Sequence, residues 1–497
     1  MKQIKKYFLL FTLFCLAGSL YLSFPVNSKR GFVTIEENKF KLNGKDFYPV
    51  AVNYIAGLYM SDTGKMWPGP GTSYDTDSLQ PIFMEDAYIK TLRADMELIK
   101  HLGFNSVRIV GIGEEVLDDD TARSAPLSVY ARLKNGNDTS VYLYTKAGYK
   151  KYFDALEILF KEVNSAGLKV VFLLRVRPNV QTTEQHLIAL LSRFKNDTTI
   201  MAYDFFNEPL YFDHKARLKT EVDSIVKKWN KLVKMYAPNQ LSTIGLEGIR
   251  EIFEWDPNIL DVDFISLHPY EFEPGQVMNE IYWYGNYIKK PWLIGETALP
   301  ADDDSITYEE QKQFAIKTLK QTFNCGAQGY TWWQYKDVNW HQYRSDYMGV
   351  VNRKGETKVT KNNLRTYGTV KPVAEAFKKF NPNEKKDSCI CLSNYYNYSE
   401  GKASRIIGRL IDEDTGKPIK GGVALGWDEH WVHSYHTISK EDGSFELLGV
   451  HRFYHWIATA TEYSVIRDDF SPDTVKAGHD GIPTLNIGTL KIKKIPL

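Results

Sequence analysis

The sequence contains few cysteines, and this shortage excludes one way of holding a fold together. Of its four cysteines, Cys15 lies in the first thirty residues, and the others are Cys325, Cys389 and Cys391. Three cysteines are too few for a disulfide framework and make no convincing metal site. Because a C-x-C pair is rarely a strain-free disulfide, we expect the hydrophobic core to hold the fold together.

A surplus of one charge is also missing. The 62 lysines and arginines nearly balance the 61 aspartates and glutamates, which gives a formal net charge of +1. Proteins that bind nucleic acid usually carry a basic surplus, so we expect no nucleic-acid partner. Aromatic residues are plentiful, at 14% of the 497 residues. They serve either ordinary core packing or stacking against sugar rings.

One long uncharged run stands at the beginning of the sequence. Three lysines precede residues 7–26, which carry no charge. The pattern predicts a secretory signal peptide within residues 1–30, and hence an exported protein that is periplasmic, cell-surface or secreted. An uncleaved N-terminal anchor is the alternative and the only membrane association that we expect. Lipidation of Cys15 is disfavoured because the T-L-F before it is a poor lipoprotein signal.

Eight short apolar runs alternate with longer amphipathic stretches. The runs are nearly continuous in hydrophobicity, as parallel strands buried on both faces should be. They lie at residues 47–54, 106–112, 169–176, 201–209, 241–248, 263–270, 292–297 and 329–335. Helical spacing predicts helices at residues 89–103, 145–167, 215–236, 308–324 and 371–380. The stretch 248–263 is only weakly helical.

This alternation predicts an α/β fold, a (β/α)8 TIM barrel, over residues 32–380. A doubly wound open sheet is the alternative, but it would not place polar residues at the ends of so many strands. Residues 381–403 are polar and without a period, which predicts a linker. Residues 404–497 alternate in polarity between turn signals such as D-T-G-K-P, which predicts a small all-β sandwich.

Two of the predicted strands end in a carboxylate. Y-D-F-F-N-E-P (203–209) places Glu208 after aromatic residues, and W-L-I-G-E-T (292–297) places Glu296 after aliphatic ones. An ionised carboxylate is costly to bury without a partner, so each must be paired, at the mouth of a pocket or held protonated. The carboxyl ends of the strands form the active site in a parallel barrel.

Other polar and aromatic residues also fall at the predicted strand ends. They are Asn53, Arg108, Asn207, Glu247, His268, Tyr270 and Trp333. Two carboxylates among such neighbours are typical of a glycosidase. Each residue alone has a plainer explanation, since Glu208 could cap a helix, Arg108 could join a structural ion pair and His268 could be a core histidine. Their joint occurrence, in order, on the expected strands favours an active site.

Glycoside hydrolysis needs one protonated and one ionised carboxylate. Glu208 is the candidate acid and Glu296 the candidate nucleophile, because strands four and seven face each other across a barrel. Asn207 is placed to hold a sugar hydroxyl. Arg108 and Tyr270 would keep Glu296 charged and oriented by donating hydrogen bonds.

On these residues the sequence resembles clan A glycoside hydrolases, most closely family five, the cellulase and mannanase group, over residues 32–380. Asn207 and Glu208 match the family's Asn-Glu acid/base pair after strand four, and Glu296 matches its nucleophile after strand seven. The other matched positions after strands two, six and eight are Arg108, His268, Tyr270 and Trp333. With Asn53 and Asn207, we expect them to bind substrate. The resemblance implies a retaining double displacement without metal or cofactor.

The expected function is therefore hydrolysis of a β-linked polysaccharide or oligosaccharide. T-I-G-L-E-G (243–248) looks like the corresponding part of family β-mannanases, which favours β-mannan, with β-glucan beside it. A transglycosylase and a non-catalytic glycan-binding protein are the alternatives, although a binding protein needs no pair such as Glu208 and Glu296. Many family members have a histidine after strand three, where this sequence has Arg175 or Arg177. Endo or exo action and the oligomeric state stay open.

Two further aromatic stretches are candidates for sugar binding. Residues 56–88 form a long predicted loop that would wall the cleft, with Trp67 as a sugar platform, or else be a surface excursion. The predicted sandwich resembles carboxypeptidase regulatory-like domains and carries E-H-W-V-H-S-Y-H (429–436) among several aromatic residues. We expect a spacer or stabilising module first and a metal site last. Between them stands sugar binding by the aromatic residues of this domain, which include Trp427, Trp431, Tyr435 and Trp456.

Overall fold

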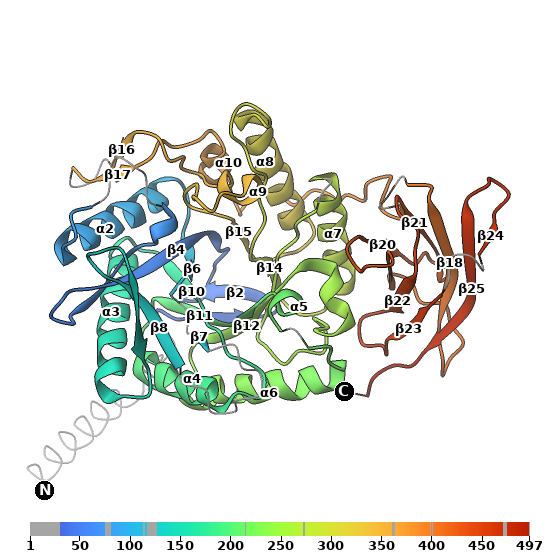
Figure 1. Cartoon of the computed structure of the whole chain (residues 1–497), viewed down its shortest axis with the longest axis horizontal. Helices are drawn as coiled ribbons and strands as arrows, with labels where there is room; N and C mark the ends of the chain where they lie inside the picture. The colour runs from blue at the N-terminus through green and yellow to red at the C-terminus, as the bar shows by residue number, and fades with distance from the viewer. Residues whose placement is uncertain are drawn as a thin grey trace, which may run out of the picture.

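The computed structural model describes residues 30–496 apart from 75–80, 113–114, 117–126, 214, 272–273, 360–362, 398, 400 and 471–474. The predicted signal peptide or anchor lies outside the described residues except for its last position. A helix-covered barrel stands beside a smaller pair of β-sheets (Figure 1). Within the described part of the chain, no helix is long and apolar enough to cross a bilayer.

Eight parallel strands close into a barrel, as the alternating pattern predicts. Around the barrel they are β4 (Val50–Met60), β6 (Ser106–Val110), β10 (Lys169–Leu173), β11 (Ile200–Asn207), β12 (Leu241–Leu246), β13 (Ile265–Leu267), β14 (Trp292–Ile294) and β15 (Tyr330–Trp332). The barrel closes where Trp332 of β15 pairs with Val52 of β4. The strand residues are almost all buried, because both faces of the sheet are covered. The doubly wound alternative is therefore wrong.

Helices cover the outside of the barrel. They are α2 (Glu85–His101), α3 (Lys146–Ser165), α4 (Gln181–Phe194), α6 (Lys219–Tyr236), α7 (Pro274–Tyr287), α8 (Tyr308–Asn324) and α10 (Ala374–Lys379), with short helices η1 (Thr72–Tyr74), α5 (Pro209–Phe212) and α9 (Tyr343–Asp346). All five predicted helices are confirmed, and α4 and α7 are additional. The weakly helical stretch after β12 forms the 3-10 helix η2 (Gly248–Phe253).

A small antiparallel sheet closes the amino end of the barrel. It consists of β1 (Val33–Glu36), β2 (Lys39–Leu42) and β3 (Lys45–Asp46). Phe40 of this sheet meets Phe264, just before β13, edge to face with ring centroids 5.0 Å apart. The carboxyl ends of the strands therefore lie at the opposite end, where barrel enzymes carry their active sites.

The predicted loop 56–88 contains a β-hairpin, because residues 56–60 belong to β4 and pair antiparallel with β5 (Met66–Pro70). After β6, the strands β7 (Glu115–Val116), β8 (Leu127–Arg132) and β9 (Asp138–Tyr142) add to the same sheet. The prediction of Trp67 as a sugar platform is wrong, because its side chain is 3% exposed. Its ring packs against Phe83, in a cluster with Tyr59 and Tyr88. The indole fills a small core of its own.

The segment 381–403 is fastened to the barrel. Cys389 forms a disulfide with Cys325, the residue that ends α8. The backbone of Ile390 exchanges two hydrogen bonds with the Gln321 side chain of α8. The expectation that the core alone holds the fold is therefore wrong here. The two cysteines are 64 positions apart, and spacing alone does not reveal such a pair, whereas Cys391 is free and exposed.

The predicted sandwich is confirmed as two four-stranded sheets. One has the order β21 (Ser444–Gly449), β18 (Ser404–Asp412), β25 (Pro483–Ile492), β24 (Lys476–Ala477), and the other β20 (Ser434–Ile438), β19 (Val423–Trp427), β22 (His455–Thr459), β23 (Ile466–Asp469). Their facing sides enclose a core that includes Leu410, Phe445, Phe453 and Trp456.

The sandwich packs against the barrel through the outer face of its β20-β19-β22-β23 sheet, beside α7 (Figure 1). Val423, Leu425 and Ile438 on that face belong to the same buried cluster as the barrel core. The Trp283 indole of α7 donates a hydrogen bond of 2.9 Å to the carbonyl of Gly421. The two domains therefore share apolar core rather than meeting only through a linker.

A buried cation joins the same interface. The Lys219 ammonium at the start of α6 bonds the Asp256 carboxylate at 2.9 Å. It also donates to the Thr459 hydroxyl and the Ala460 carbonyl of the sandwich, both at 3.0 Å. Because its side chain is 2% exposed, these partners replace the water that the ammonium loses on burial.

Candidate active site

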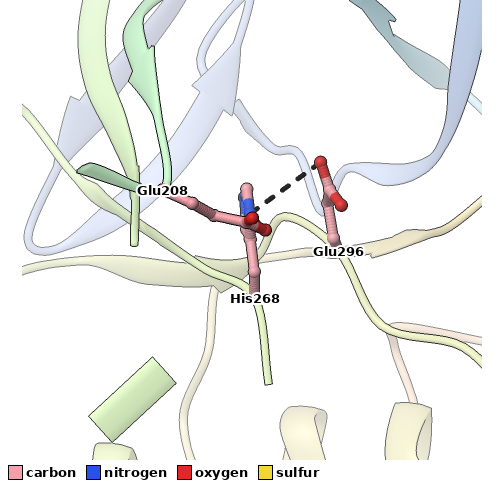
Figure 2. Close-up of side chains that lie close together, drawn as sticks. All are labelled: Glu208, His268 and Glu296. Carbon is pink, nitrogen blue, oxygen red and sulfur yellow. Dashed lines mark hydrogen bonds and ion pairs between the residues drawn. The ribbon is translucent and has the colours of Figure 1, made fainter. Parts of the chain in front are cut away.

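Glu208 and Glu296 follow the ends of β11 and β14, and their side chains point toward one another and toward His268 (Figure 2). Carboxylate oxygens of both residues and a ring nitrogen of His268 lie within 4.8 Å of one another. Glycosidases that attack the sugar directly have carboxyl groups about 5 Å apart, and a wider gap admits a water molecule. The spacing fits direct attack.

The backbone at Glu208 turns the side chain into the barrel mouth. Glu208 has a φ of 45° and a ψ of 68°, in the left-handed region, and Pro209 begins α5 directly after it. Its backbone N–H donates to the Gly245 carbonyl of β12 at 2.8 Å. The side chain makes no capping hydrogen bond to the helix. The helix-cap explanation of Glu208 is therefore wrong.

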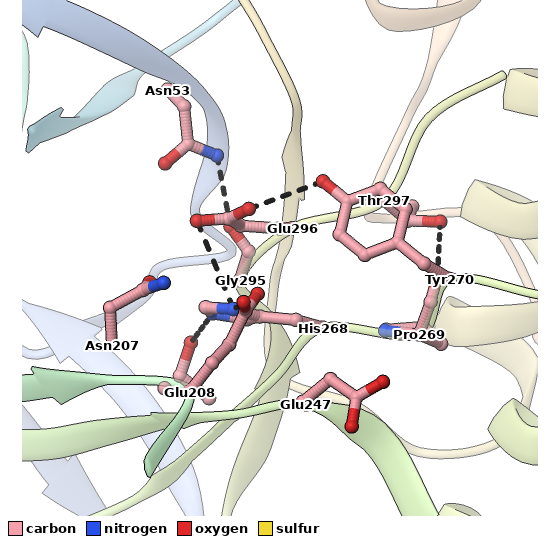
Figure 3. A network of polar contacts seen from close by, with 12 residues as sticks. Asn53, Asn207, Glu208, Glu247, His268, Pro269, Tyr270, Gly295, Glu296 and Thr297 are labelled. Atoms are coloured by element: carbon pink, nitrogen blue, oxygen red, sulfur yellow. Dashed lines mark hydrogen bonds and ion pairs between the residues drawn. The ribbon is translucent and has the colours of Figure 1, made fainter. Parts of the chain in front are cut away.

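Arg108 of β6 organises the floor of the site, where it bonds Asn53, Asn207 and Glu296. Figure 3 shows these three partners gathered with Glu208 and His268 at the barrel mouth. The Arg108 guanidinium donates to Asp204 at 2.8 Å, to the Asn53 side-chain oxygen at 3.0 Å and to the Asn207 side-chain oxygen at 2.8 Å. It also donates to Oε1 of Glu296. Arg108 is 1% exposed, so its charge acts on these partners with little screening by water.

Asp204 is a residue of this site that the strand-end reasoning missed. It lies inside β11 and is fully buried, with Oδ2 bonded to Arg108 and Oδ1 accepting from the Gly245 N–H at 3.0 Å. Buried charges need a partner. The signal that could have revealed it is an aspartate among apolar residues in the middle of a strand, which the sequence Y-D-F-F (203–206) displays.

His268 lies between the carboxylates, in a space that two glycines leave open. Its Nδ1 is 2.9 Å from Glu208 Oε1 and 3.8 Å from Glu296 Oε1. A Cβ on Gly245 would lie 2.6 Å from the His268 ring, and one on Gly295 would lie 1.9 Å from the Ser266 hydroxyl. Gly245, two positions before Glu247, and Gly295, directly before Glu296, therefore make room for the imidazole.

Two aromatic residues complete the mouth of the barrel. The Tyr270 hydroxyl donates to Oε2 of Glu296 at 3.2 Å. Burial and the neighbouring carboxylates raise the pKa of Tyr270 well above its usual value, so the hydroxyl remains a donor. Trp333 is half-buried, 6.3 Å from the Trp340 ring, while Trp332 is fully buried. The Trp333 backbone N–H donates to the Thr297 carbonyl at 3.1 Å, which places this residue next to Glu296 at the mouth of the barrel.

The surroundings give the two carboxyl groups different properties. Burial raises the pKa of Glu208 to about 7, against the opposing effect of Arg108. Burial also raises the pKa of Glu296, while His268 and the Arg108 guanidinium act to lower it. Burial lowers the pKa of His268 to about 4, so its ring is neutral at pH 7. Glu208 can therefore hold a proton near neutral pH while Arg108 favours the ionised form of Glu296.

Glu247 adds a third carboxylate after β12. Its Oε1 accepts from the Arg250 guanidinium, and its Oε2 is buried without a hydrogen-bond partner. Burial raises the pKa of Glu247 to about 7, with Arg250 opposing it and Glu208 adding to it. The group lies close enough to Glu208 for the two charges to interact and is paired with a cation, which makes it a candidate for contacting a ligand.

Two groups of described residues could in principle ligate a metal ion. They are Glu208, His268 and Glu296, and Glu271, Glu280 and His436. Each group has an arginine of the chain acting on its carboxylates, Arg108 in the first and Arg250 in the second. These internal cations account for the paired carboxylates without a metal.

The structure joins seven of the eight predicted site residues in one polar network, and the backbone of the eighth, Trp333, bonds Thr297 beside it. These residues fall into a buried group and a partly exposed group. Asn53, Arg108 and His268 are at most 1% exposed and lie beneath the carboxylates, so they position those groups. Asn207, Glu208, Tyr270 and Trp333 are partly exposed, so a ligand in the barrel mouth could contact them.

No protein-family model matches the sequence, and no curated protein matches it either. Solved structures with a similar course of the chain include an exo-β-1,4-mannosidase from Opitutaceae bacterium strain TAV5, with 15% identity, a TM-score of 0.46, and coverage of 69% of this chain and 61% of that one. A glycoside hydrolase family 5 mannosidase from Rhizomucor miehei has 12% identity, a TM-score of 0.45 and coverage of 70% and 96%.

A β-glucuronidase from Bacteroides uniformis is also similar, with 12% identity and a TM-score of 0.44 over 92% of this chain and 47% of that one. This chain spans about half the length of that β-glucuronidase and of a second one from Dictyoglomus thermophilum. At such identities and TM-scores these are similarities only.

Proposed function

We propose that the protein is a retaining β-glycoside hydrolase that works by double displacement, with Glu208 as acid/base and Glu296 as nucleophile. The observation that carries this proposal is the placement of two carboxyl groups within 4.8 Å, one protonatable near pH 7 and the other bonded to a buried arginine. This is the pair that the reaction requires.

In the first step, Glu208 gives its proton to the glycosidic oxygen as the bond to the anomeric carbon breaks. A carboxylate oxygen of Glu296 attacks that carbon and forms a glycosyl ester. Arg108 and Tyr270 hold the two oxygens of Glu296, at Oε1 and Oε2, so that the ionised carboxylate is aimed before substrate arrives. Positioning of this kind removes part of the entropic cost of the attack.

In the second step, Glu208 has lost its proton and becomes a base. It takes a proton from water, the water oxygen bonds to the anomeric carbon and the Glu296 ester breaks. Each glutamate then regains its starting form. His268 stays neutral at pH 7 and 2.9 Å from Glu208, so it orients this carboxyl group in both protonation states without adding charge.

The proposed substrates are β-linked polysaccharides or oligosaccharides, with β-mannan and β-glucan to be tested first. The sequence of β12 and its end, T-I-G-L-E-G (243–248), supports mannan because it looks like the corresponding part of family β-mannanases. The polar groups at the mouth that suit sugar hydroxyls are Asn207 and Glu247, and Trp333 offers a ring.

The test is release of reducing sugar from β-mannan, β-glucan, xylan and galactan by the full chain. We expect release from at least one polymer and a loss of several orders of magnitude in Glu296→Ala. Glu309→Gln, an exposed carboxylate on α8, is the matched control and should keep full activity. Near-normal activity of Glu296→Ala would refute the assignment.

A chemical rescue identifies the nucleophile independently. In Glu296→Gly, added azide should occupy the space of the missing carboxylate and attack an activated aryl glycoside. The product expected is a glycosyl azide of inverted anomeric configuration. Absence of this product, with an intact fold and active native chain, would assign Glu296 another role. Formation of oligosaccharides longer than the substrate, without a net gain of reducing ends, would instead indicate a transglycosylase, and binding without turnover would indicate a glycan-binding protein.

We further propose that the protein works in an oxidising compartment, outside the reducing cytosol. The disulfide between Cys325 and Cys389 supports this, because disulfides persist mainly in exported proteins. Cell fractionation with a thiol-labelling assay tests it. Labelling of Cys325 and Cys389 in freshly isolated protein would contradict the proposal.

A further inference from the structure

The sandwich carries an exposed aromatic surface, the aromatic platform, made by Trp427, Trp431 and His455. The Trp431 side chain is 56% exposed and lies parallel to the His455 ring, with centroids 3.7 Å apart and an interplanar angle of 13°. The Trp427 ring lies 5.3 Å from Trp431. An exposed tryptophan with one ring supported from behind offers area for a ligand with a flat apolar face.

The platform is on the side of the sandwich that faces the barrel. Successive side chains of a strand point to opposite faces, so Val423, Leu425 and Trp427 of β19 share one face. Val423 and Leu425 are buried in the shared cluster of barrel and sandwich, and Trp427 packs against that cluster while still partly exposed. The interface therefore continues into the platform at the end of β19.

The platform also lies toward the catalytic end of the barrel. α7 follows β13, so it begins at the carboxyl ends of the barrel strands and runs toward the amino ends. Gly421, just before β19, bonds Trp283 in the last turns of α7. His436 of β20 pairs with Leu425 of β19. Its side chain lies close to that of Glu280, which belongs to the first half of α7. β19 therefore climbs along α7 toward the catalytic end, and Trp427 lies beyond Leu425.

The path from the platform to the catalytic carboxylates is short. A carboxylate oxygen of Glu271 lies within 4.8 Å of a ring nitrogen of His436. Glu271 directly follows Tyr270, whose hydroxyl donates to Glu296. At about 3.3 Å per strand residue, Trp427 is roughly 7 Å further along β19 than Leu425. A saccharide chain of a few units could therefore reach from Glu296 to the platform.

The platform is held in place before any ligand binds. The His455 ring nitrogen Nδ1 is 2.8 Å from the Asp469 carboxylate, which fixes the ring beneath Trp431. The backbone N–H of Trp431 donates to the Asp428 carbonyl at 3.2 Å. Trp431 itself has a φ of 60°, a conformation that side chains of its type rarely adopt. The loop therefore presents the indole in one orientation, and the Asp469 carboxylate, which is exposed, bonds the ring beneath it.

We propose that Trp427 and Trp431 form a saccharide-binding site that holds the part of a polysaccharide chain extending from the active site. Sugar rings present flat C–H faces that stack on indole and hydroxyls that bond neighbouring carboxylates. The occupant is thus the same polymer that the barrel acts on. This inference rests on the proposed function for the identity of its ligand, and the binding itself is testable without turnover.

Affinity electrophoresis in gels containing galactomannan, β-glucan or xylan tests the site. The parent is the full chain carrying Glu296→Ala, which binds without cleaving. We expect one of the polymers to retard it, and Trp431→Asn to weaken that binding about five- to tenfold. Asparagine tolerates a positive φ, so this variant removes the ring without adding strain. Met235→Asn, on α6 and 59% exposed, is the matched control and should bind as the parent does.

A third variant separates stacking from loop stability. Trp431→Phe keeps a ring and should retain a measurable part of the affinity. If the Phe and Asn variants lose affinity equally and both melt at lower temperature, Trp431 stabilises the loop and the proposal is overturned. Equal retardation of parent and Trp431→Asn overturns it too, as does the absence of retardation by every polymer.

Turnover by the native chain decides the proposed function separately. Sugar release with no effect of Trp431→Asn on polymer binding would leave the hydrolase standing without the platform. Retardation that depends on Trp431, with no release from any substrate, would leave the platform on a protein that binds glycans. With both functions present, Trp431→Asn should lower kcat/KM for polymer relative to an aryl glycoside by about fivefold.

Discussion

Replacing Glu208 with glutamine should change activity and stability in opposite directions. The substitution keeps the shape of the side chain and removes its titration. The Glu208 pKa of about 7, against an ordinary value of 4.5, means that the group is about half protonated at pH 7. Activity on substrates with poor leaving groups depends on that proton.

The effect on activity follows from the titration. In the native chain, kcat/KM for a poor leaving group should fall above pH 7 and be about a hundredfold lower at pH 9, where about one part in a hundred of Glu208 is protonated. Glu208→Gln should remove this decline and lower the rate about 10²- to 10⁴-fold. An activated aryl glycoside needs no proton to leave, so its glycosylation step should lose far less.

The effect on stability follows from linkage. Because the folded state raises the pKa of Glu208, it binds the proton more tightly than the unfolded chain and loses stability as the pH rises from about 4.5 to 7. The difference amounts to at most about 3 kcal/mol. Glu208→Gln should therefore match the native chain at pH 4 and melt higher at pH 8, by on the order of 4 °C for a domain of this size.

Two assays decide the matter, and they are independent. Profiles of kcat/KM against pH for alkyl and aryl glycosides test the proton, and scanning calorimetry at pH 4 and pH 8 tests the linkage. Equal losses on both classes of substrate would show that Glu208 is structural. A melting temperature unchanged at pH 8 would show that its carboxyl group is not held protonated by burial.

Three further variants test the supporting structure. Arg108→Met removes the cation between two buried carboxylates and should destabilise the fold by about 3–5 kcal/mol, as measured by calorimetry, and a loss under 1 kcal/mol would contradict the network. Gly295→Ala places a Cβ 1.9 Å from the Ser266 hydroxyl and should abolish turnover. Its control, Gly275→Ala, places a Cβ at an ordinary contact distance of 3.9 Å from the Leu392 side chain and should be tolerated. Cys325→Ser should lower stability by about 2–5 kcal/mol and should no longer respond to dithiothreitol, and an unchanged melting temperature would show that the disulfide is dispensable.

The barrel could be predicted because parallel strands covered on both sides must be apolar throughout. Each run then ends at the same rim, so the residue after it becomes a candidate for the site. That reasoning placed Glu208, Glu296 and their neighbours correctly in space. It did not reveal which of them are accessible, since Asn53 and Arg108 lie beneath the carboxylates. Accessibility depends on the loops above the strands, which carry no comparable pattern.

Other features depend on contacts between distant segments. Asp204 matters because Arg108 reaches it from another strand, and Cys325 pairs with a cysteine 64 positions away. α7 escaped prediction because it begins with Pro274 and Gly275 and carries aromatic residues around most of its circumference, so its period is obscured. It needs apolar residues on two sides because it lies between the barrel and the sandwich.

The shared core around α7 has a consequence for the history of the chain. Domains joined by a flexible linker can be exchanged freely, but here Val423, Leu425 and Ile438 are buried against the barrel, and Lys219 finds partners in both parts. Removing the sandwich would expose an apolar face and take two hydrogen-bond acceptors away from the Lys219 ammonium. Recombination that transplanted either domain alone would have had to alter both surfaces at once, so the two are expected to have been inherited as a unit.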